Sequence, residues 1–180
     1  MVIFLKIPRE IVEKASAGDR TAFGEIYYSC YRDFYNFALF TVGNPEDAAD
    51  VVADSFVEIL RGIGKLRNPE AFSSWAFRIL GIRCKKEIRE IMRRRGILNF
   101  DELGELPSLG SVNMAEELSE NASLFAALSA LEAEDRMIVV LYVLHGYTHR
   151  EISEITGRPE GTVKSRLYRA YEKLRKLMKE

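Results

Sequence analysis

The chain has 180 residues, of which 47% are hydrophobic, so it can bury one large core or two small ones. Its net charge of −1 at pH 7 excludes a uniformly basic nucleic-acid coat protein. The two cysteines, Cys30 and Cys84, lie in no metal-ligand or redox spacing, and no apolar run is long enough to span a membrane. Residues 1–5 are apolar but lack the length and the cleavage site of a signal peptide, so we expect a cytoplasmic protein without membrane insertion.

The first half of the chain is predicted to form four helices. The Asn-Pro pairs at 44–45 and 68–69 each supply a helix cap followed by a proline at the first helical position. Asp19 is a further cap, and Gly43 stops the helix that follows it. Apolar residues recur at helical spacing between these signals. We expect the four helices over residues 7–17, 19–43, 46–61 and 69–95.

The predicted helix over residues 46–61 carries a row of carboxylates to one side of its apolar stripe. The row consists of Asp47, Asp50, Asp54 and Glu58. Like charges four residues apart repel each other by about 0.2–0.5 kcal/mol per pair, which a basic protein surface would relieve. A solvated face is the simpler interpretation of the row on its own. A metal site has no His or Cys to support it, and a hydrolytic carboxylate pair would need a pocket rather than a convex helix.

The predicted helix over residues 69–95 combines aromatic and basic residues. Trp75 lies on its apolar stripe, so we expect it in the core. Residues 78–95 hold eight Lys or Arg against two acidic residues, a net charge of +6. Such a segment suits a single-stranded or melting nucleic acid, because phosphates pair with Arg and Lys while bases stack on aromatic rings. A solvated basic face is the alternative. The candidate contacts are Arg78, Lys85, Arg89 and Arg93.

An acidic segment separates this helix from the rest of the chain. Residues 96–119 hold five acidic and no basic residues, a net charge of −5. We therefore expect an all-α protein with two small helical domains joined by an acidic flexible linker. The domains are predicted over residues 1–96 and 119–180, with the linker over 97–118. Because the linker has few apolar residues, the two domains are expected to move independently.

The most specific pattern lies between residues 148 and 170, after two further predicted helices at about 114–128 and 132–144. A T-x-x-E capping box, a Gly-Arg-Pro break and a second helix with regular apolar spacing predict a helix-turn-helix. The second helix has a basic, hydrogen-bonding face that suits a DNA major groove. A surface hairpin with a solvated face is the alternative. The face residues are Lys164, Ser165, Arg166, Tyr168 and Arg169.

With these motifs laid out, the chain resembles a bacterial RNA polymerase sigma factor of the extracytoplasmic-function (ECF) type, in the sigma-70 superfamily. GDRTAFGEIYY resembles the opening helix of that family, and EDAADVVADSFVEIL resembles its polymerase-binding helix. FSSWAFRIL and the basic run after it resemble the segment that melts and reads the −10 promoter element. RPEGTVKSRLYRA is similar to the −35 recognition helix. The chain departs from the family's −10 pattern at Ile82 and Lys86.

The resemblance implies a promoter-specificity subunit with no catalytic residue and no cofactor or metal. The helix-turn-helix would read the −35 element of promoter DNA, and the basic helix would help to melt the −10 element. An anti-sigma factor often accompanies such a protein. The residues implied to bind the β′ clamp helices of core RNA polymerase are Asp47, Asp50, Val51, Asp54 and Glu58.

Two other functions remain open from the residues alone. One is a stand-alone helix-turn-helix transcriptional regulator, in which the N-terminal domain dimerises or senses a signal. The other is an enzyme that uses Asp47, Asp50 and Asp54 with a metal ion, although no catalytic or nucleotide-binding motif accompanies them. His145 and His149 are separated by a glycine and a helix cap, so they predict no metal site.

Overall fold

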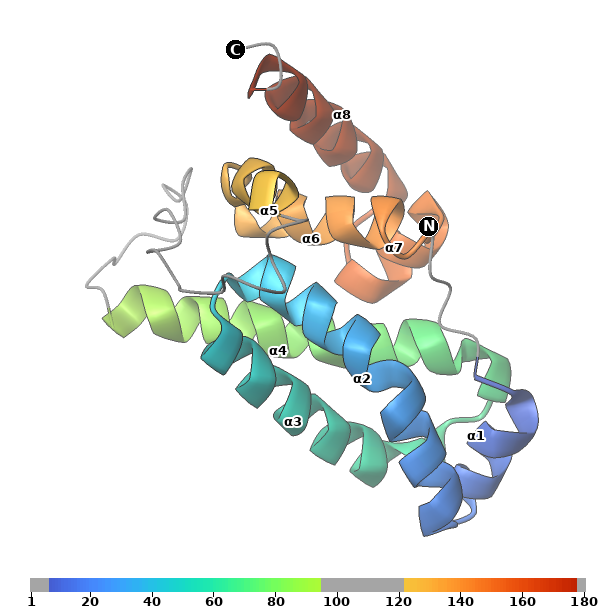
Figure 1. Cartoon of the computed structure of the whole chain (residues 1–180). Helices are drawn as coiled ribbons and strands as arrows, with labels where there is room; N and C mark the ends of the chain where they lie inside the picture. Colours follow the sequence, from blue (N-terminus) through green and yellow to red (C-terminus); the bar gives the residue numbers. More distant parts are fainter. Residues whose placement is uncertain (1–6, 95–121, 178–180) are drawn as a thin grey trace.

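The computed structural model describes residues 7–94 and 122–177, and within these ranges it contains helices and no strand (Figure 1). The predicted all-α class is confirmed. The helices are α1 (Arg9–Ser16), α2 (Arg20–Val42), α3 (Pro45–Gly62), α4 (Phe72–Arg94), α5 (Ala122–Ser129), α6 (Ala133–Val143), α7 (His149–Thr156) and α8 (Glu160–Leu177), with short 3₁₀ turns η1 (Ile63–Lys65) and η2 (Pro69–Ala71). The predicted acidic linker over residues 97–118 lies outside the described residues.

Helices α2 and α3 begin at the predicted caps, whereas the cap predicted for the fourth helix, Asn68, starts the 3₁₀ turn η2 and α4 begins at Phe72. The Asp19 carboxylate accepts hydrogen bonds from the backbone N–H groups of Thr21 at 2.8 Å and Ala22 at 3.1 Å. Asn44 caps α3 in the same way. Gly43 ends α2 in the left-handed conformation, with φ 89°, which favours glycine. These contacts satisfy backbone groups that a helix end would otherwise leave without a partner.

Helices α1 to α4 form one packed group around an aromatic centre. The ring of Phe34 on α2 has its centroid 5.2 Å from that of Phe56 on α3 and 5.1 Å from that of Phe77 on α4. Trp75 packs against this core, as predicted. Gly62 makes room for the indole, because a Cβ at that position would lie 2.9 Å from the ring. The three long helices thus share one closely packed centre.

Helices α5 to α8 form a second group that ends in the helix-turn-helix. Thr148 and Glu151 form the capping box in both directions at the start of α7. Gly157 ends α7 with φ 71°, and α8 follows at once. Val163 and Leu167 on the apolar side of α8 are buried, as their spacing predicts. The local geometry of the helix-turn-helix therefore follows from its sequence.

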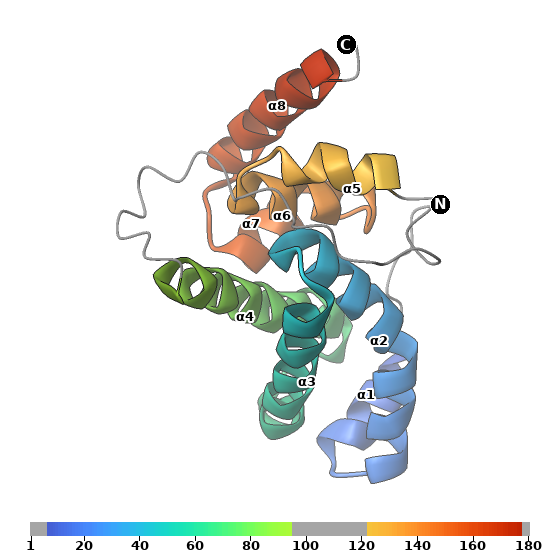
Figure 2. The same cartoon turned by 60° about the vertical axis from the view of Figure 1, so that its left-hand side comes forward.

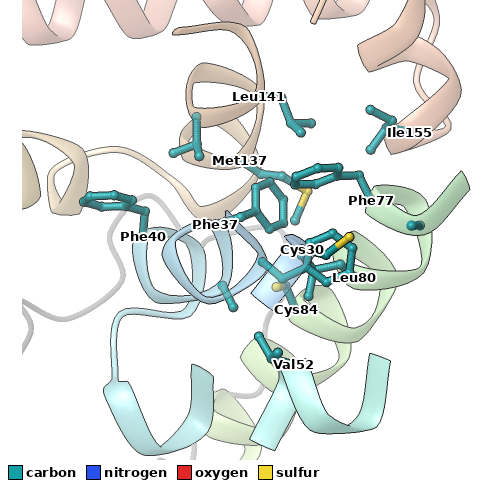
Figure 3. Close-up of a cluster of buried hydrophobic side chains, with 14 of the residues drawn as sticks. Cys30, Phe37, Phe40, Val52, Phe77, Leu80, Cys84, Met137, Leu141 and Ile155 are labelled. Carbon is teal, nitrogen blue, oxygen red and sulfur yellow. The ribbon is translucent and has the colours of Figure 1, made fainter. Parts of the chain in front are cut away.

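The two groups pack against each other, with α6 against α2 and α7 against α4 (Figures 1 and 2). Phe77 of α4 lies at the junction (Figure 3), where its ring centroid is 5.4 Å from Phe37, 4.8 Å from His145 and 5.4 Å from Tyr147. Residues 136–141 of α6 are all buried, so this helix needs partners on more than one side. The buried side chains of both groups form one continuous core. The two domains were expected to move independently because the linker has few apolar residues. The composition of the linker, however, carries no information about this apolar surface between the domains.

Substitution of Phe77 by Ala tests how much the junction stabilises the chain. The ring is fully buried between both groups, so we expect Phe77→Ala to lower the free energy of unfolding by about 3–5 kcal/mol. Ile82→Ala on the exposed side of the same helix is the control, with an expected change within about 0.5 kcal/mol. Urea unfolding followed by circular dichroism measures both. Equal effects of the two substitutions would contradict the central place of Phe77.

Candidate partner-binding and nucleic-acid interfaces

The acidic row of α3 is largely neutralised by basic side chains of α4. Arg83 reaches Asp54, with Nη1 3.2 Å from Oδ2, and its Nη2 donates to Glu58. Arg94 lies 3.9 Å from Asp47. The hydrogen bond to Glu58 raises the pKa of Arg83. From the sequence, we expected a partner protein to relieve the repulsion among these carboxylates. For three of the four, basic side chains of the same chain relieve it instead.

Two of the residues implied to bind polymerase, Asp50 and Val51, lie outside this network. Asp50 is exposed and makes no ion pair with another described residue. Val51, which the resemblance included among the polymerase contacts, is buried with 4% of its surface exposed. It therefore belongs to the core beneath the row. On the exposed side of α3, the apolar residues Val57 and Leu60 lie on the same helical face as Asp50, with 45% and 55% of their surface exposed.

Arg83 is a residue that sequence reasoning counted only as part of a net charge. On α4 it lies one position before the buried Cys84, on the side that packs against α3. Arg83 and Glu87 are four residues apart and Arg94 follows seven later, so they share a helical side. Arg83 and Arg94 thus form a basic pair on the side of α4 that faces the acidic row of the preceding helix. This pairing of opposite charges is the signal in the sequence that could have revealed the network.

The candidate nucleic-acid contacts on α4 fall into two environments. Arg78, Arg89 and Arg93 are exposed. Lys85 is half-buried against the second group of helices, and its Nζ donates to the Thr156 carbonyl of α7 at 3.1 Å. Burial lowers the pKa of Lys85, while a nearby carboxylate opposes that shift. Three of the four residues are therefore accessible to a strand, although Arg93 also pairs with Glu90, and the fourth is held inside the chain.

The recognition face of α8 is similarly divided. Four of its five residues are exposed: Lys164, Ser165, Tyr168 and Arg169. Arg166 instead turns toward the start of α6, where its guanidinium lies 2.6 Å from the Asp135 carboxylate and 3.0 Å from that of Glu134. The sequence predicted Arg166 as part of the DNA face, but its guanidinium forms these internal ion pairs instead. The acidic first turn of α6 gave no separate signal in the sequence, because acidic residues are common at helix starts.

The remaining candidate groups offer little chemistry. Among residues 7–94 and 122–177, no cluster of three or more His, Cys, Asp or Glu is arranged to hold a metal ion. Cys30 and Cys84 are buried free thiols, and burial raises the pKa of Cys30 to about 12 and that of Cys84 further still. His149 stacks on Tyr142 with ring centroids 5.2 Å apart. No helix in the described ranges is both long and apolar enough to cross a membrane.

Two family models match the chain. The model described as sigma-70 region 2 matches residues 26–94, and the one described as sigma-70, region 4 matches residues 122–174. Among curated proteins, the RNA polymerase sigma factor SigV of Bacillus subtilis is 34% identical over 144 residues, which cover 80% of this chain and 83% of SigV. The ECF RNA polymerase sigma factor SigM of Mycobacterium tuberculosis is 30% identical and covers 94% of this chain and 83% of SigM.

Two solved structures share the fold. CnrH, in complex with the cytosolic domain of CnrY, superposes with a TM-score of 0.71 at 23% identity and covers 95% of this chain and 96% of that one. The sigma factor RpoE of Bartonella quintana, in complex with the anti-sigma factor NepR, gives a TM-score of 0.67 at 22% identity and covers 87% of this chain and 96% of that one. At these identities the likeness concerns the fold.

The network at Arg83 predicts a measurable coupling between α3 and α4. We expect Arg83→Gln to destabilise the chain and to couple with Glu58→Gln by about 0.2–1 kcal/mol in a double-mutant cycle, the range of partly exposed ion pairs. The coupling should shrink at high salt, because exposed charges are screened. Arg78→Gln, on an exposed arginine of the same helix, is the matched control. Strictly additive effects of Arg83→Gln and Glu58→Gln would contradict the network.

Proposed function

The chain belongs to the sigma-70 family of RNA polymerase sigma factors and is of the ECF type, and we propose how its surfaces divide the work of transcription initiation. The exposed face of α3 docks on the β′ clamp helices of core RNA polymerase. The exposed cations of α4 contact the −10 element, and the recognition face of α8 reads the −35 element. The observation that carries this division is that these three faces are exposed and lie on separate helices.

The docking face is the part of α3 that the chain does not use for itself. Asp50, Val57 and Leu60 are exposed on one side of the helix, whereas Val51 and Ser55 are buried on the other. Carboxylates beside exposed apolar residues suit a partner helix that presents both basic and apolar side chains. Asp54 and Glu58 contribute through their partly exposed oxygens, although Arg83 already offsets much of their charge.

The two DNA-contacting faces differ in what they can read. On α8, the guanidinium of Arg169 and the hydroxyls of Ser165 and Tyr168 are exposed and can reach base edges in a major groove. On α4, Arg78 and Arg89 are exposed cations that suit the phosphates of a strand leaving the duplex. We therefore expect α8 to supply sequence selection and α4 to hold the opened strand.

The proposed domain division is a region 2 unit over residues 1–96, a linker over 97–118 and a region 4 unit over 119–180. Because CnrH and RpoE are described in complexes with CnrY and the anti-sigma factor NepR, we expect an anti-sigma protein to regulate this chain as well. We expect this chain itself to act in the cytoplasm, where polymerase and promoters meet. A stand-alone helix-turn-helix regulator is not favoured, because the chain matches the region 2 model in addition to the region 4 model.

Charge reversal at Asp50 tests the docking face. Asp50 is exposed and outside the Arg83 network, so Asp50→Lys should leave the fold intact. We expect it to weaken binding to core polymerase about tenfold, because a like charge would then face a basic partner surface. Glu25→Lys, at an exposed carboxylate on α2, is the matched control. Binding of labelled protein to core polymerase gives both affinities, and unchanged affinity of Asp50→Lys would refute the docking assignment.

Substitutions on α8 separate base reading from phosphate contact. Arg169→Ala should cost about 1–3 kcal/mol of −35 binding and relax selection at one base pair. Lys164→Ala should weaken all sequences alike and reduce the salt dependence by about one unit. Arg166→Ala should instead lower thermal stability, because it leaves the Asp135 carboxylate without its ion-pair partner and removes one of the cations around Glu134. Selection of binding sites from randomised duplexes, with thermal melts, measures all three, and identical sequence profiles for Arg169→Ala and Lys164→Ala would contradict the assignment.

A further inference from the structure

Helix α4 exposes a single uncharged side chain among its cations. The exposed residues of this helix are Arg78, Ile82, Lys86, Arg89, Arg93 and Arg94. All of them are basic except Ile82, which has 56% of its surface exposed. One exposed apolar residue is ordinary on a protein surface, so exposure alone indicates no function. The position of Ile82 among the cations is what distinguishes it.

Ile82 lies at the centre of a basic stripe that runs along α4. At 3.6 residues per turn, Arg78, Ile82, Lys86, Arg89 and Arg93 fall within a sector of about 80° around the helix axis, with Ile82 in its middle. Arg78 and Lys86 lie four residues before and after Ile82, about 6 Å away along the helix on either side. Neither forms an ion pair with a carboxylate within residues 7–94 or 122–177, so both remain available to a polyanion.

A strand bound along this stripe would meet two kinds of side chain. Arg78 and Lys86 can pair with its phosphates, and because they are about 12 Å apart along the helix, a strand held at both passes over Ile82. The aliphatic side chain of Ile82 can neither neutralise a phosphate nor donate a hydrogen bond to it, so burying a phosphate against it would be unfavourable. The group that Ile82 contacts must therefore belong to a sugar or a base.

Among the groups on base edges, the 5-methyl of thymine is the apolar one. Contact between this methyl group and Ile82 would remove apolar surface of both from water, which favours thymine over a base that lacks the methyl. Isoleucine has no donor or acceptor, so it cannot select a base by hydrogen bonds. Ile82 is also one of the two positions at which the chain departs from the family's −10 pattern, so this contact is particular to the chain.

We propose that Ile82 is a specificity-determining residue of the α4 surface and selects thymine through its 5-methyl group. The inference rests on the proposed contact between α4 and the opened strand. Arg78 and Lys86 hold phosphates on either side, and Ile82 makes an apolar contact with a base between them. Because selection depends on the methyl group alone, thymine is preferred over uracil at this position, and 5-methylcytosine is preferred over cytosine.

Two pairs of single-stranded DNA probes isolate the methyl group. Oligo(dT) and oligo(dU) of twelve nucleotides differ only in the 5-methyl, and so do oligo(5-methyl-dC) and oligo(dC). A homopolymer presents the same base to Ile82 in every register, so the test needs no promoter sequence. Fluorescence anisotropy at low salt measures the affinity of the full-length chain for each probe. We expect the methylated member of each pair to bind about fourfold more tightly, the ratio that burial of one methyl group gives.

Substitutions at Ile82 assign this preference to its side chain. Ile82→Val keeps a branched apolar group and should retain most of the ratio between the methylated and unmethylated probes. Ile82→Ala removes most of the apolar contact and should reduce both ratios to below about twofold. Val143→Ala, at a residue of α6 with 43% of its surface exposed, is the matched control and should keep the ratios of the parent chain. Equal ratios in the parent chain and in Ile82→Ala would overturn the inference.

A phosphate-contact variant separates this inference from the proposed role of α4. Arg89→Gln should weaken binding of all four probes alike, keep both ratios and reduce the salt dependence by about 0.7 units. If Arg89→Gln weakens binding while Ile82→Ala leaves the ratios unchanged, the methyl contact is wrong and the strand contact of α4 stands. If Arg89→Gln has no effect, or the parent chain binds no probe, the strand contact is wrong and the inference falls with it. Weaker binding of Ile82→Ala to core polymerase, with unchanged ratios, would instead place Ile82 in a protein interface and overturn the inference.

Discussion

The arrangement of this chain depends on the packing of α4 against its neighbours on both sides. One side of α4 joins α2 and α3 through Phe77 and Arg83, and another receives α7 from the second group of helices. The exposed remainder carries the cations that suit nucleic acid. One helix therefore serves the core, the junction and the proposed strand contact.

Charge is distributed so that some cations are used internally and others are left for a partner. Arg83 neutralises carboxylates of α3, and Arg166 neutralises those of α6. Arg78 and Arg169 remain exposed on the faces expected to meet DNA. A net charge of −1 therefore coexists with two locally basic faces. Association with DNA should depend on these local faces rather than on the overall charge.

Local features of the fold could be predicted from the sequence because their causes are local. The caps at Asp19 and Asn44 and the capping box at Thr148 act within a few residues, and the structure confirms each of them. The apolar spacing of Val163 and Leu167 likewise fixed the buried side of α8. Family membership was predicted from the resemblance of four sequence segments, and the matching family models confirm it.

Contacts between distant helices could not be predicted in the same way. The pairing of Arg83 with Asp54 and Glu58, and of Lys85 with Glu134, depends on which helices become neighbours in space. The burial of Arg166 likewise depends on the position of α6. One signal for the junction was present, namely the nearly unbroken apolar run at residues 137–141. A helix with so many apolar residues cannot be covered by the second group alone. The linker composition, in contrast, indicated two independent domains.

The most direct test of the central claim is run-off transcription by core RNA polymerase on genomic fragments, with and without this chain. We expect discrete transcripts from a limited set of fragments only when both are present, because promoter selection and strand opening need the sigma surfaces together with the polymerase. No new transcript in the presence of the chain, under conditions where a known sigma factor supports initiation, would contradict its assignment as a working initiation factor.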